Sequence, residues 1–278
     1  YLDSAPSELQ LEMAQLKLLC DEVFEEKNYI NTISIKAKVS AGASGGGEDR
    51  RLKKNIEYLL CYSGSDFSRF DFIYKKTELM TYIKEMEDEG KSYKYTNILA
   101  NEGSKTYFKT IKDGSGDEIK IFKHSGYEIK SVNQIKKDEK LSEEEVYRKY
   151  FDKIMTTTNA QSSIRQRVWD ATDQNNNFYS IEYTPKTGRN KNKITNLFFV
   201  GKKKVLVIWL KDTAEILKNG KMFKKEKYGT FWDKISWNNV NKEGGIEFSN
   251  GKKPIELIKR ILLLMQSRED LIVLDFFA

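Results

Sequence analysis

The closing segment of the chain, residues 270–278, most constrains the fold. Its apolar run, 271–274, has the length and branching of a strand buried on both faces, which is typical of parallel sheets. Before it, Pro254 stands where the first position of a helix favours proline. The apolar face expected of that helix consists of Ile255, Ile258, Ile261, Leu262 and Met265. A helix followed by a buried strand is typical of a wound α/β domain.

The middle of the chain, residues 63–228, has a different pattern. Short aromatic strands alternate with turn signals, most clearly in the hairpin 107–123 around Asp-Gly-Ser-Gly-Asp. Ser142 and Glu145 form a capping box that opens a helix expected to extend through Ile154. A further helix is expected at 163–171, and the remaining strands are expected at 178–183, 197–200 and 205–210. This pattern predicts a β-rich domain inserted into an α/β domain.

The first 62 residues return to mixed structure. A helix is expected to about residue 26, followed by strands at 29–39 and 56–62. The Gly-rich segment 41–47 between these strands lacks the Gly-Lys-Ser/Thr ending of a phosphate-binding loop, so we expect a mobile connector. The predicted fold class is therefore α+β, with segments 1–62, 63–228 and 229–278.

Composition excludes several functional classes. His124 is the only histidine, which rules out Ser-His-Asp hydrolases and His-rich zinc sites, and no metal cluster is visible. The two cysteines show no disulfide framework, which favours a reducing cytoplasm. No segment approaches the roughly 20 apolar residues that a membrane span needs.

Positive charge is concentrated in one part of the chain. The net charge is +7, and residues 186–227 hold thirteen Lys or Arg against three acidic residues. A concentrated basic surface attracts polyanions such as nucleic acid. The alternative is a solvated lysine-rich face.

Three groups of short segments, in chain order, carry a family resemblance. The first comprises Leu-Lys-Leu-Leu-Cys-Asp-Glu-Val-Phe at 16–24, Asn-Tyr-Ile at 28–30 and Asn-Ile-Glu-Tyr-Leu-Leu at 55–60. The second runs from Lys-Tyr-Phe-Asp-Lys-Ile at 149–154 through Thr-Thr-Thr-Asn-Ala-Gln-Ser-Ser-Ile-Arg at 156–165. The third comprises Gly-Thr-Phe-Trp at 229–232, Gly-Lys-Lys-Pro at 251–254 and Asp-Phe-Phe-Ala at 275–278. The ordered set resembles the methylation (Mod) subunit of type III restriction-modification systems, of the class whose recognition domain lies between the catalytic and cofactor motifs.

This resemblance implies methyl transfer from S-adenosylmethionine to the exocyclic amino group of adenine in double-stranded DNA, with the base swung out of the stack. It also implies a restriction subunit as a partner, and it allows a second methylation subunit in addition. Residues 1–62 and 229–278 would then be pieces of a Rossmann-like methyltransferase core, and 63–228 the target-recognition domain.

The resemblance also bears on individual residues. The family's catalytic Asp-Pro-Pro-Tyr is absent, and Asp-Ser-Ala-Pro at 3–6 is only a superficial echo, so no catalytic residue is predicted. The cofactor motif lacks its Gly-Ser-Gly. Five residues match what remains of the cofactor site: Lys253, Pro254, Asp275, Phe276 and Phe277. We therefore expect a fragment that reads DNA, with cofactor binding and catalysis belonging to the intact parent protein. The alternatives are a free-standing basic module that binds RNA or a protein, and a truncated pseudo-enzyme that serves as a dimerisation platform.

The candidate DNA-reading residues lie mainly between 159 and 167, because Asn and Gln can pair with adenine, Arg with guanine, and Ser with phosphate. They are Asn159, Gln161, Ser162, Arg165 and Arg167. Since the two arginines are two positions apart, at most one is expected to reach base edges. The alternative is that Asn159 and Ser162 cap a helix while both arginines are solvated.

Phosphate contacts are expected from the charged run 187–193, which has no anchoring apolar pattern. The candidates are Arg189, Lys191 and Lys193.

Overall fold

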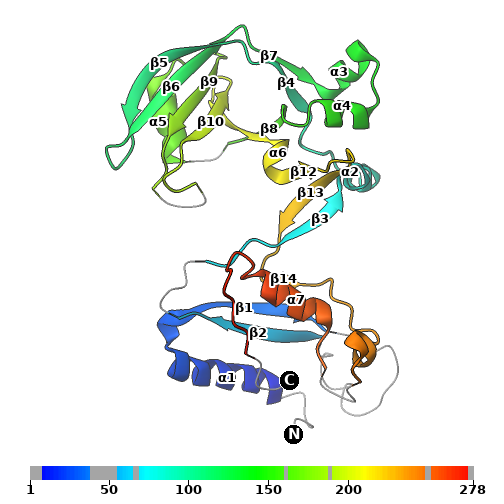
Figure 1. Cartoon of the computed structure of the whole chain (residues 1–278). Helices are drawn as coiled ribbons and strands as arrows, with labels where there is room; N and C mark the ends of the chain where they lie inside the picture. The colour runs from blue at the N-terminus through cyan, green and yellow to red at the C-terminus, as the bar shows by residue number, and fades with distance from the viewer. Residues whose placement is uncertain are drawn as a thin grey trace. The chain divides into compact units, whose positions relative to one another are not determined.

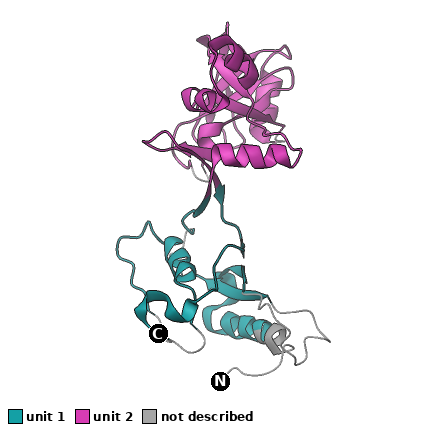
Figure 2. Ribbon diagram, turned by 90° about the vertical axis from the view of Figure 1, so that its right-hand side faces the viewer, with its two compact units in different colours: residues 1–75, 226–278 teal, residues 76–225 magenta. Residues whose placement is uncertain are grey.

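The computed structural model describes residues 8–37, 55–64, 69–159, 162–186, 190–247 and 252–274. The chain divides into two compact units (Figure 2). Unit 1 combines Tyr1–Lys75 with Glu226–Ala278, and unit 2 is Lys76–Lys225. Unit 2 is thus inserted in sequence between the two parts of unit 1. Both helices and strands are abundant, so the fold class is α+β.

Unit 1 contains a three-stranded sheet with the order β14-β1-β2. Strand β1 (Tyr29–Lys36) pairs antiparallel with β2 (Ile56–Tyr62) and parallel with β14 (Phe231–Trp232). The other elements are α1 (Glu8–Phe24), η1 (Glu26–Asn28), η3 (Val240–Gly245) and α7 (Ile255–Leu263). The alternation of β1 turns Ile33 and Ile35 into a core that contains Trp232, Ile235 and Leu257.

Helix α1 is tied to this sheet by polar contacts. The Tyr62 hydroxyl donates a 2.7 Å hydrogen bond to Asp21, and the Lys17 ammonium lies 4.2 Å from the centre of the Tyr29 ring. Lys17 also pairs with Asp21 one helical turn away.

Unit 2 is built on an eight-stranded sheet with the order β5-β6-β9-β10-β11-β8-β4-β7 (Figure 1). Its strands are β4 (Asn97–Asn101), β5 (Ser104–Lys112), β6 (Glu118–Ser125), β7 (Glu128–Ser131), β8 (Ile154–Thr158), β9 (Phe178–Tyr183), β10 (Thr195–Val200) and β11 (Val205–Trp209). A second sheet has the order β12-β13-β3, made of β12 (Ala214–Ile216), β13 (Met222–Lys227) and β3 (Tyr74–Glu78). The chain passes between the two units in β3 and β13.

The helices of unit 2 gather at the two ends of the large sheet (Figure 1). Helix α5 (Ser163–Ala171) packs Val168 against Ile121, Tyr179 and Phe199. The remaining helices are α2 (Leu79–Asp88), α3 (Val132–Glu139), α4 (Glu143–Lys149) and the short α6 (Leu210–Thr213). Their buried side chains share a second core with Ile98 and Ile154.

The face of the sheet opposite α5 has a core of its own. Phe178 precedes Tyr179 on β9, so its side chain points to the other face, where it packs with Leu99, Met155 and Val207. Two layers of buried side chains on opposite faces explain why residues 178–181 of β9 are all buried.

Several local predictions are confirmed. The hairpin predicted at 107–123 is β5–β6, in which Asp113 accepts hydrogen bonds from the amides of Ser115 and Asp117. Ser142 and Glu145 form the predicted capping box, and α5 has the predicted bounds. The helix opened by Ser142 ends at Lys149, however, and Ile154 begins strand β8. Its successors Met-Thr-Thr-Thr include three β-branched residues, which favour a strand.

Two predictions for the C-terminal part are wrong. Residues 271–274 form no strand and are 40 to 92% exposed. A strand exists only through pairing, and none of the described strands pairs with this apolar run. In α7 the buried residues are Leu257 and Arg260, whereas Ile258 and Leu262 are 44% and 38% exposed. Leu257 belongs to the core of unit 1, and the Arg260 guanidinium lies over the rings of Tyr228 and Trp232. The buried face is therefore displaced around the helix from the predicted one.

Candidate functional site

Helix α5 is the central element of the candidate DNA-reading segment. Ser162 caps it, accepting a hydrogen bond from the Arg165 amide at 3.2 Å. Val168 is fully buried, and Ile164 and Ala171 pack beside it, so this row faces the sheet. The row on the opposite side is exposed and consists of Ser163, Gln166 and Asp170.

The two predicted arginines leave α5 in opposite directions and bind backbone. Arg165 donates from Nη2 to the Lys203 carbonyl at 2.7 Å, and its guanidinium lies 6.0 Å from the centre of the Trp169 ring. Arg167 donates from Nη1 to the Lys112 carbonyl at 3.2 Å. Both arginines are half-buried. Arg165 joins α5 to the β10–β11 turn, and Arg167 joins α5 to the β5–β6 turn.

The other predicted DNA-binding residues are spread along the adjoining loops. Asn159 is exposed just after β8, and Lys191 and Lys193 are exposed in the turn before β10. Neither lysine has an ion-pair partner among the described residues. Gln161 and Arg189 lie outside the described residues.

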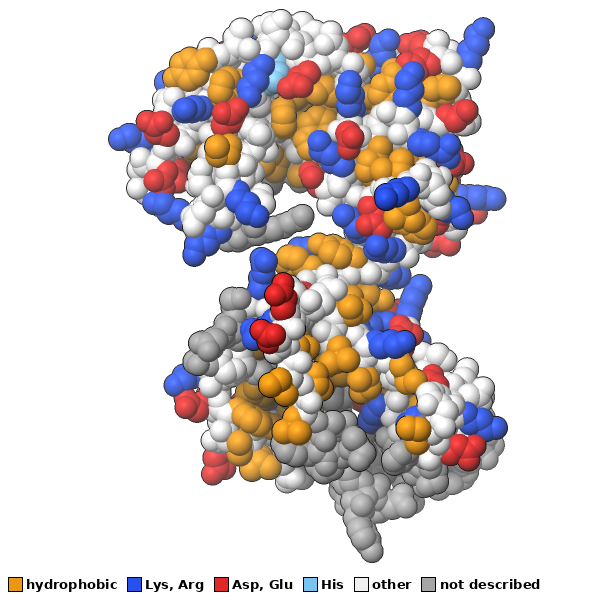
Figure 3. All heavy atoms as spheres, viewed as in Figure 1, with side chains coloured by type: hydrophobic (Ala, Val, Ile, Leu, Met, Phe, Trp, Pro, Cys, Tyr) orange, Lys and Arg blue, Asp and Glu red, His pale blue; other side chains and the backbone are white. Residues whose placement is uncertain are grey.

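The basic stretch 186–227 does not form one surface. It continues through β10, β11, α6, β12 and β13, and on the face shown in Figure 3 the basic and acidic side chains of unit 2 are interspersed. Lys204 points inward and is fully buried. Its ammonium donates to the carbonyls of Asn175 at 2.8 Å and Gly201 at 3.2 Å, and lies 3.9 Å from Asp173. Burial lowers the pKa of Lys204, and Asp173 partly opposes this effect.

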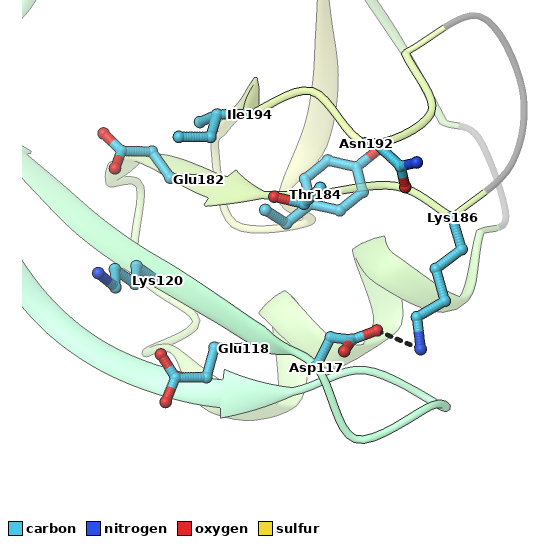
Figure 4. A pocket seen from close by; sticks show the side chains of 9 residues that line it. Asp117, Glu118, Lys120, Glu182, Thr184, Lys186, Asn192 and Ile194 are labelled. Atoms are coloured by element: carbon cyan, nitrogen blue, oxygen red, sulfur yellow. Dashed lines mark ion pairs between the residues drawn. The ribbon is translucent and has the colours of Figure 1, made fainter.

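A cavity of about 480 Å³ lies where strand β6 begins and its neighbour β9 ends (Figure 4). Three carboxylates and two ammonium groups are among its lining side chains: Asp117, Glu118, Glu182, Lys120 and Lys186. Lys186 pairs with Asp117 at 2.7 Å, and Glu182 pairs with Lys105 from outside the cavity at 2.6 Å. An excess of carboxylates disfavours phosphate, so this cavity is not suited to the DNA backbone.

Unit 1 has a cavity of about 340 Å³ between the segment 69–73 and the residues around β14. Phe70, Phe72, Tyr228 and Trp232 contribute to its walls. The Asp71 carboxylate accepts a hydrogen bond from the Ser267 amide at 2.7 Å, which lowers the pKa of Asp71.

The two cofactor candidates that the structure describes, Lys253 and Pro254, do not line either cavity. Lys253 pairs with Glu57 of β2 at 2.7 Å, and Pro254 is buried at the start of α7. Asp275, Phe276 and Phe277 lie outside the described residues. These two candidates alone do not form a site that fits S-adenosylmethionine.

Among the described residues, no group of three or more His, Cys, Asp or Glu side chains could hold a metal ion. Likewise, none of the helices in the described part of the chain is long and apolar enough to cross a membrane.

Gln166, an exposed polar residue of α5, was not among the predicted DNA-reading residues, which included its two arginine neighbours. The helical periodicity of α5 could have identified this position from the sequence. Ile164, Val168 and Ala171 define the buried row, and Gln166 lies almost diametrically opposite that row at 100° per residue.

Comparisons with known proteins place the chain in a family. Residues 8–278 match the DNA methylase family of N6 and N4 methyltransferases. The chain is 38% identical over 269 residues to the probable type III restriction-modification enzyme HindVI Mod subunit of Haemophilus influenzae. That match covers 96% of this chain and 35% of the relative, so the chain spans about a third of the relative's length. No solved structure matches the chain. The extent of the family match shows that the chain belongs to the DNA methylase family.

Proposed function

We propose that this chain recognises a specific sequence in double-stranded DNA for an adenine methyltransferase of a type III restriction-modification system. Unit 2 is the target-recognition domain in this proposal, and unit 1 belongs to the methyltransferase core. The protein as a whole would use S-adenosylmethionine, act with a restriction subunit and work in the cytoplasm.

The match to the Mod subunit over 96% of the chain is the observation that carries this proposal. The Asp-Pro-Pro-Tyr motif of the resembled family does not occur in these 278 residues, so the proposal assigns them recognition and not catalysis. The exposed lysines before β10 add a means of binding phosphate, since ammonium groups replace the counterions condensed on DNA. Asn159, Ser162, Lys191 and Lys193 remain candidates for contact with DNA.

The test is selection of duplexes from a random library by the 278-residue chain, followed by titration of the selected duplex at 50 and 200 mM salt. We expect one enriched sequence and an affinity that falls steeply with salt, because each phosphate contact contributes about −0.9 to the slope of log K against log salt. Equal binding to all duplexes, or preference for RNA or for a protein partner, contradicts the proposal.

A double variant tests the phosphate contacts. Lys191→Ala with Lys193→Ala is expected to weaken binding to every duplex and to reduce the salt slope by up to about 2, because two ammonium groups no longer displace counterions. The matched control is Lys84→Ala with Lys137→Ala, which removes two exposed lysines from helices α2 and α3 at the opposite end of the large sheet (Figure 1). An equal loss in both double variants would show that only net charge matters.

A further inference from the structure

We infer that Gln166 reads an adenine in the major groove, and that Arg165 and Arg167 position the reading helix instead of contacting bases. This inference rests on the proposed function, because it names the side chain through which unit 2 distinguishes sequences.

The exposed row of α5 is accessible to a duplex. The row Ser163, Gln166 and Asp170 projects away from the sheet, with Gln166 at its centre. A B-form major groove is about 12 Å wide and admits one helix. Because the buried row of α5 lies on the opposite side, the exposed row can enter a groove without any loss of core packing.

Cations flank the helix on both sides. Lys202 and Lys203 are exposed in the β10–β11 turn, which Arg165 joins to α5. Lys112 is exposed at the end of β5, which Arg167 joins to the other side of the helix. A helix in the major groove has a phosphate backbone on each side, so this arrangement of charges complements DNA.

The Gln166 amide is already oriented. Its Nε2 donates one hydrogen bond to Asp170 Oδ1 at 2.8 Å, one turn further along α5. The second N–H of Nε2 and the carbonyl Oε1 remain for a partner. These two groups match adenine, whose N7 accepts a hydrogen bond and whose N6 amino group donates one.

Arg165 and Arg167 already donate hydrogen bonds within unit 2. Each guanidinium donates to a turn carbonyl, and Arg165 Nε is buried without a hydrogen-bond partner. Turning either arginine toward a base would break the contact that holds a lysine-bearing turn against α5. They are therefore positioning residues.

The experiment compares Gln166→Ala with Gln174→Ala, which changes an exposed glutamine outside any helix. Each variant of the 278-residue chain is titrated with the selected duplex and with duplexes that carry every single-base change. Gln166→Ala is expected to remove the preference for adenine at one position, a change of about 5- to 150-fold, and to leave affinity for unrelated duplexes unchanged. Gln174→Ala is expected to behave as the unaltered chain.

Arg165→Ala and Arg167→Ala complete the set, with circular dichroism and urea unfolding to confirm that each variant folds. They are expected to lower stability and to weaken binding to all duplexes together, with partial rescue of stability by Arg165→Lys. If Gln166→Ala keeps the full preference, or if a folded arginine variant loses preference at a single base, the inference is wrong although DNA recognition still stands. If the unaltered chain shows no preference, the proposed function itself fails.

Discussion

Lys204 is a cation inside unit 2 that holds two loops together. Its ammonium bonds the carbonyls of Asn175 and Gly201, and it lies 5.2 Å from the centre of the Tyr179 ring. Lys204→Met keeps most of the side-chain volume but removes this donor, so we expect a loss of about 1–3 kcal/mol in the free energy of unfolding. Urea denaturation measures the change. The exposed neighbour provides the control, and a similar loss in Lys203→Met would contradict this account.

His124 should make stability depend on pH. It is buried, with Nε2 2.8 Å from Ser180 Oγ and Nδ1 3.3 Å from the Glu102 carbonyl oxygen. Burial lowers the pKa of His124, and the Glu102 carboxylate only partly opposes this effect. The unfolded chain therefore binds a proton at a higher pH, near 6.5, than the folded chain. The neutral imidazole makes its full contribution to the free energy of unfolding above that pH. This contribution is lost as the pH falls toward the pKa of His124 in the folded chain.

Urea unfolding at pH 7.5 and pH 5.5 tests this prediction. The free energy of unfolding is expected to be lower at pH 5.5, and the difference is expected to shrink in His124→Gln. Because His124 is the only histidine, no other side chain has its ordinary pKa in this range. Equal stability at the two pH values would rule out the buried neutral imidazole.

At the scale of elements, two glycines with the same backbone conformation allow the cost of backbone strain to be distinguished from the cost of a steric clash. Gly103 and Gly126 both have φ of +73°, in the turns before β5 and β7. A Cβ at Gly103 would lie 2.3 Å from the Ser125 carbonyl oxygen and 2.8 Å from the Tyr127 nitrogen, whereas a Cβ at Gly126 would meet nothing within 4 Å. Gly126→Ala is expected to cost about 1–2 kcal/mol from backbone strain. Gly103→Ala is expected to cost about 1–3 kcal/mol more, because backbone atoms must shift.

Thermal unfolding of both alanine variants provides the measurement. Equal losses of stability in the two variants would show that the turn before β5 relaxes to accommodate the added Cβ. The close approach of Gly103 to the residues before β7 would then add no cost.

At the scale of the whole molecule, separate cores predict separate unfolding. The core of unit 1 includes Ile35, and a core of unit 2 includes Ile121. Each of the four buried clusters formed by the described residues belongs to a single unit. We expect two calorimetric transitions, with Ile35→Ala lowering one and Ile121→Ala the other, each by about 2–5 kcal/mol. A single transition that both variants lower would show that the units unfold as one.

Local chemistry made several elements predictable from the sequence. The Asp-Gly-Ser-Gly-Asp turn, the capping box of Ser142 and Glu145, and the bounds of α5 depend on residues within a few positions of one another. Family membership was predictable for a related reason, because the resemblance depends on the order of short segments, which the sequence displays directly.

The tertiary structure alone decided which side chains face inward. The sequence pattern placed Lys204 among the charges of a basic surface, and Arg165 and Arg167 among the candidate DNA-binding residues. Contacts 29, 38 and 55 positions away instead bind these three side chains to backbone carbonyls. Residues 271–274 carry a strand pattern but have no paired neighbour among the described strands. Composition and periodicity specify what a segment is able to form. Burial and pairing depend on partners distant in sequence, which only the folded chain brings together.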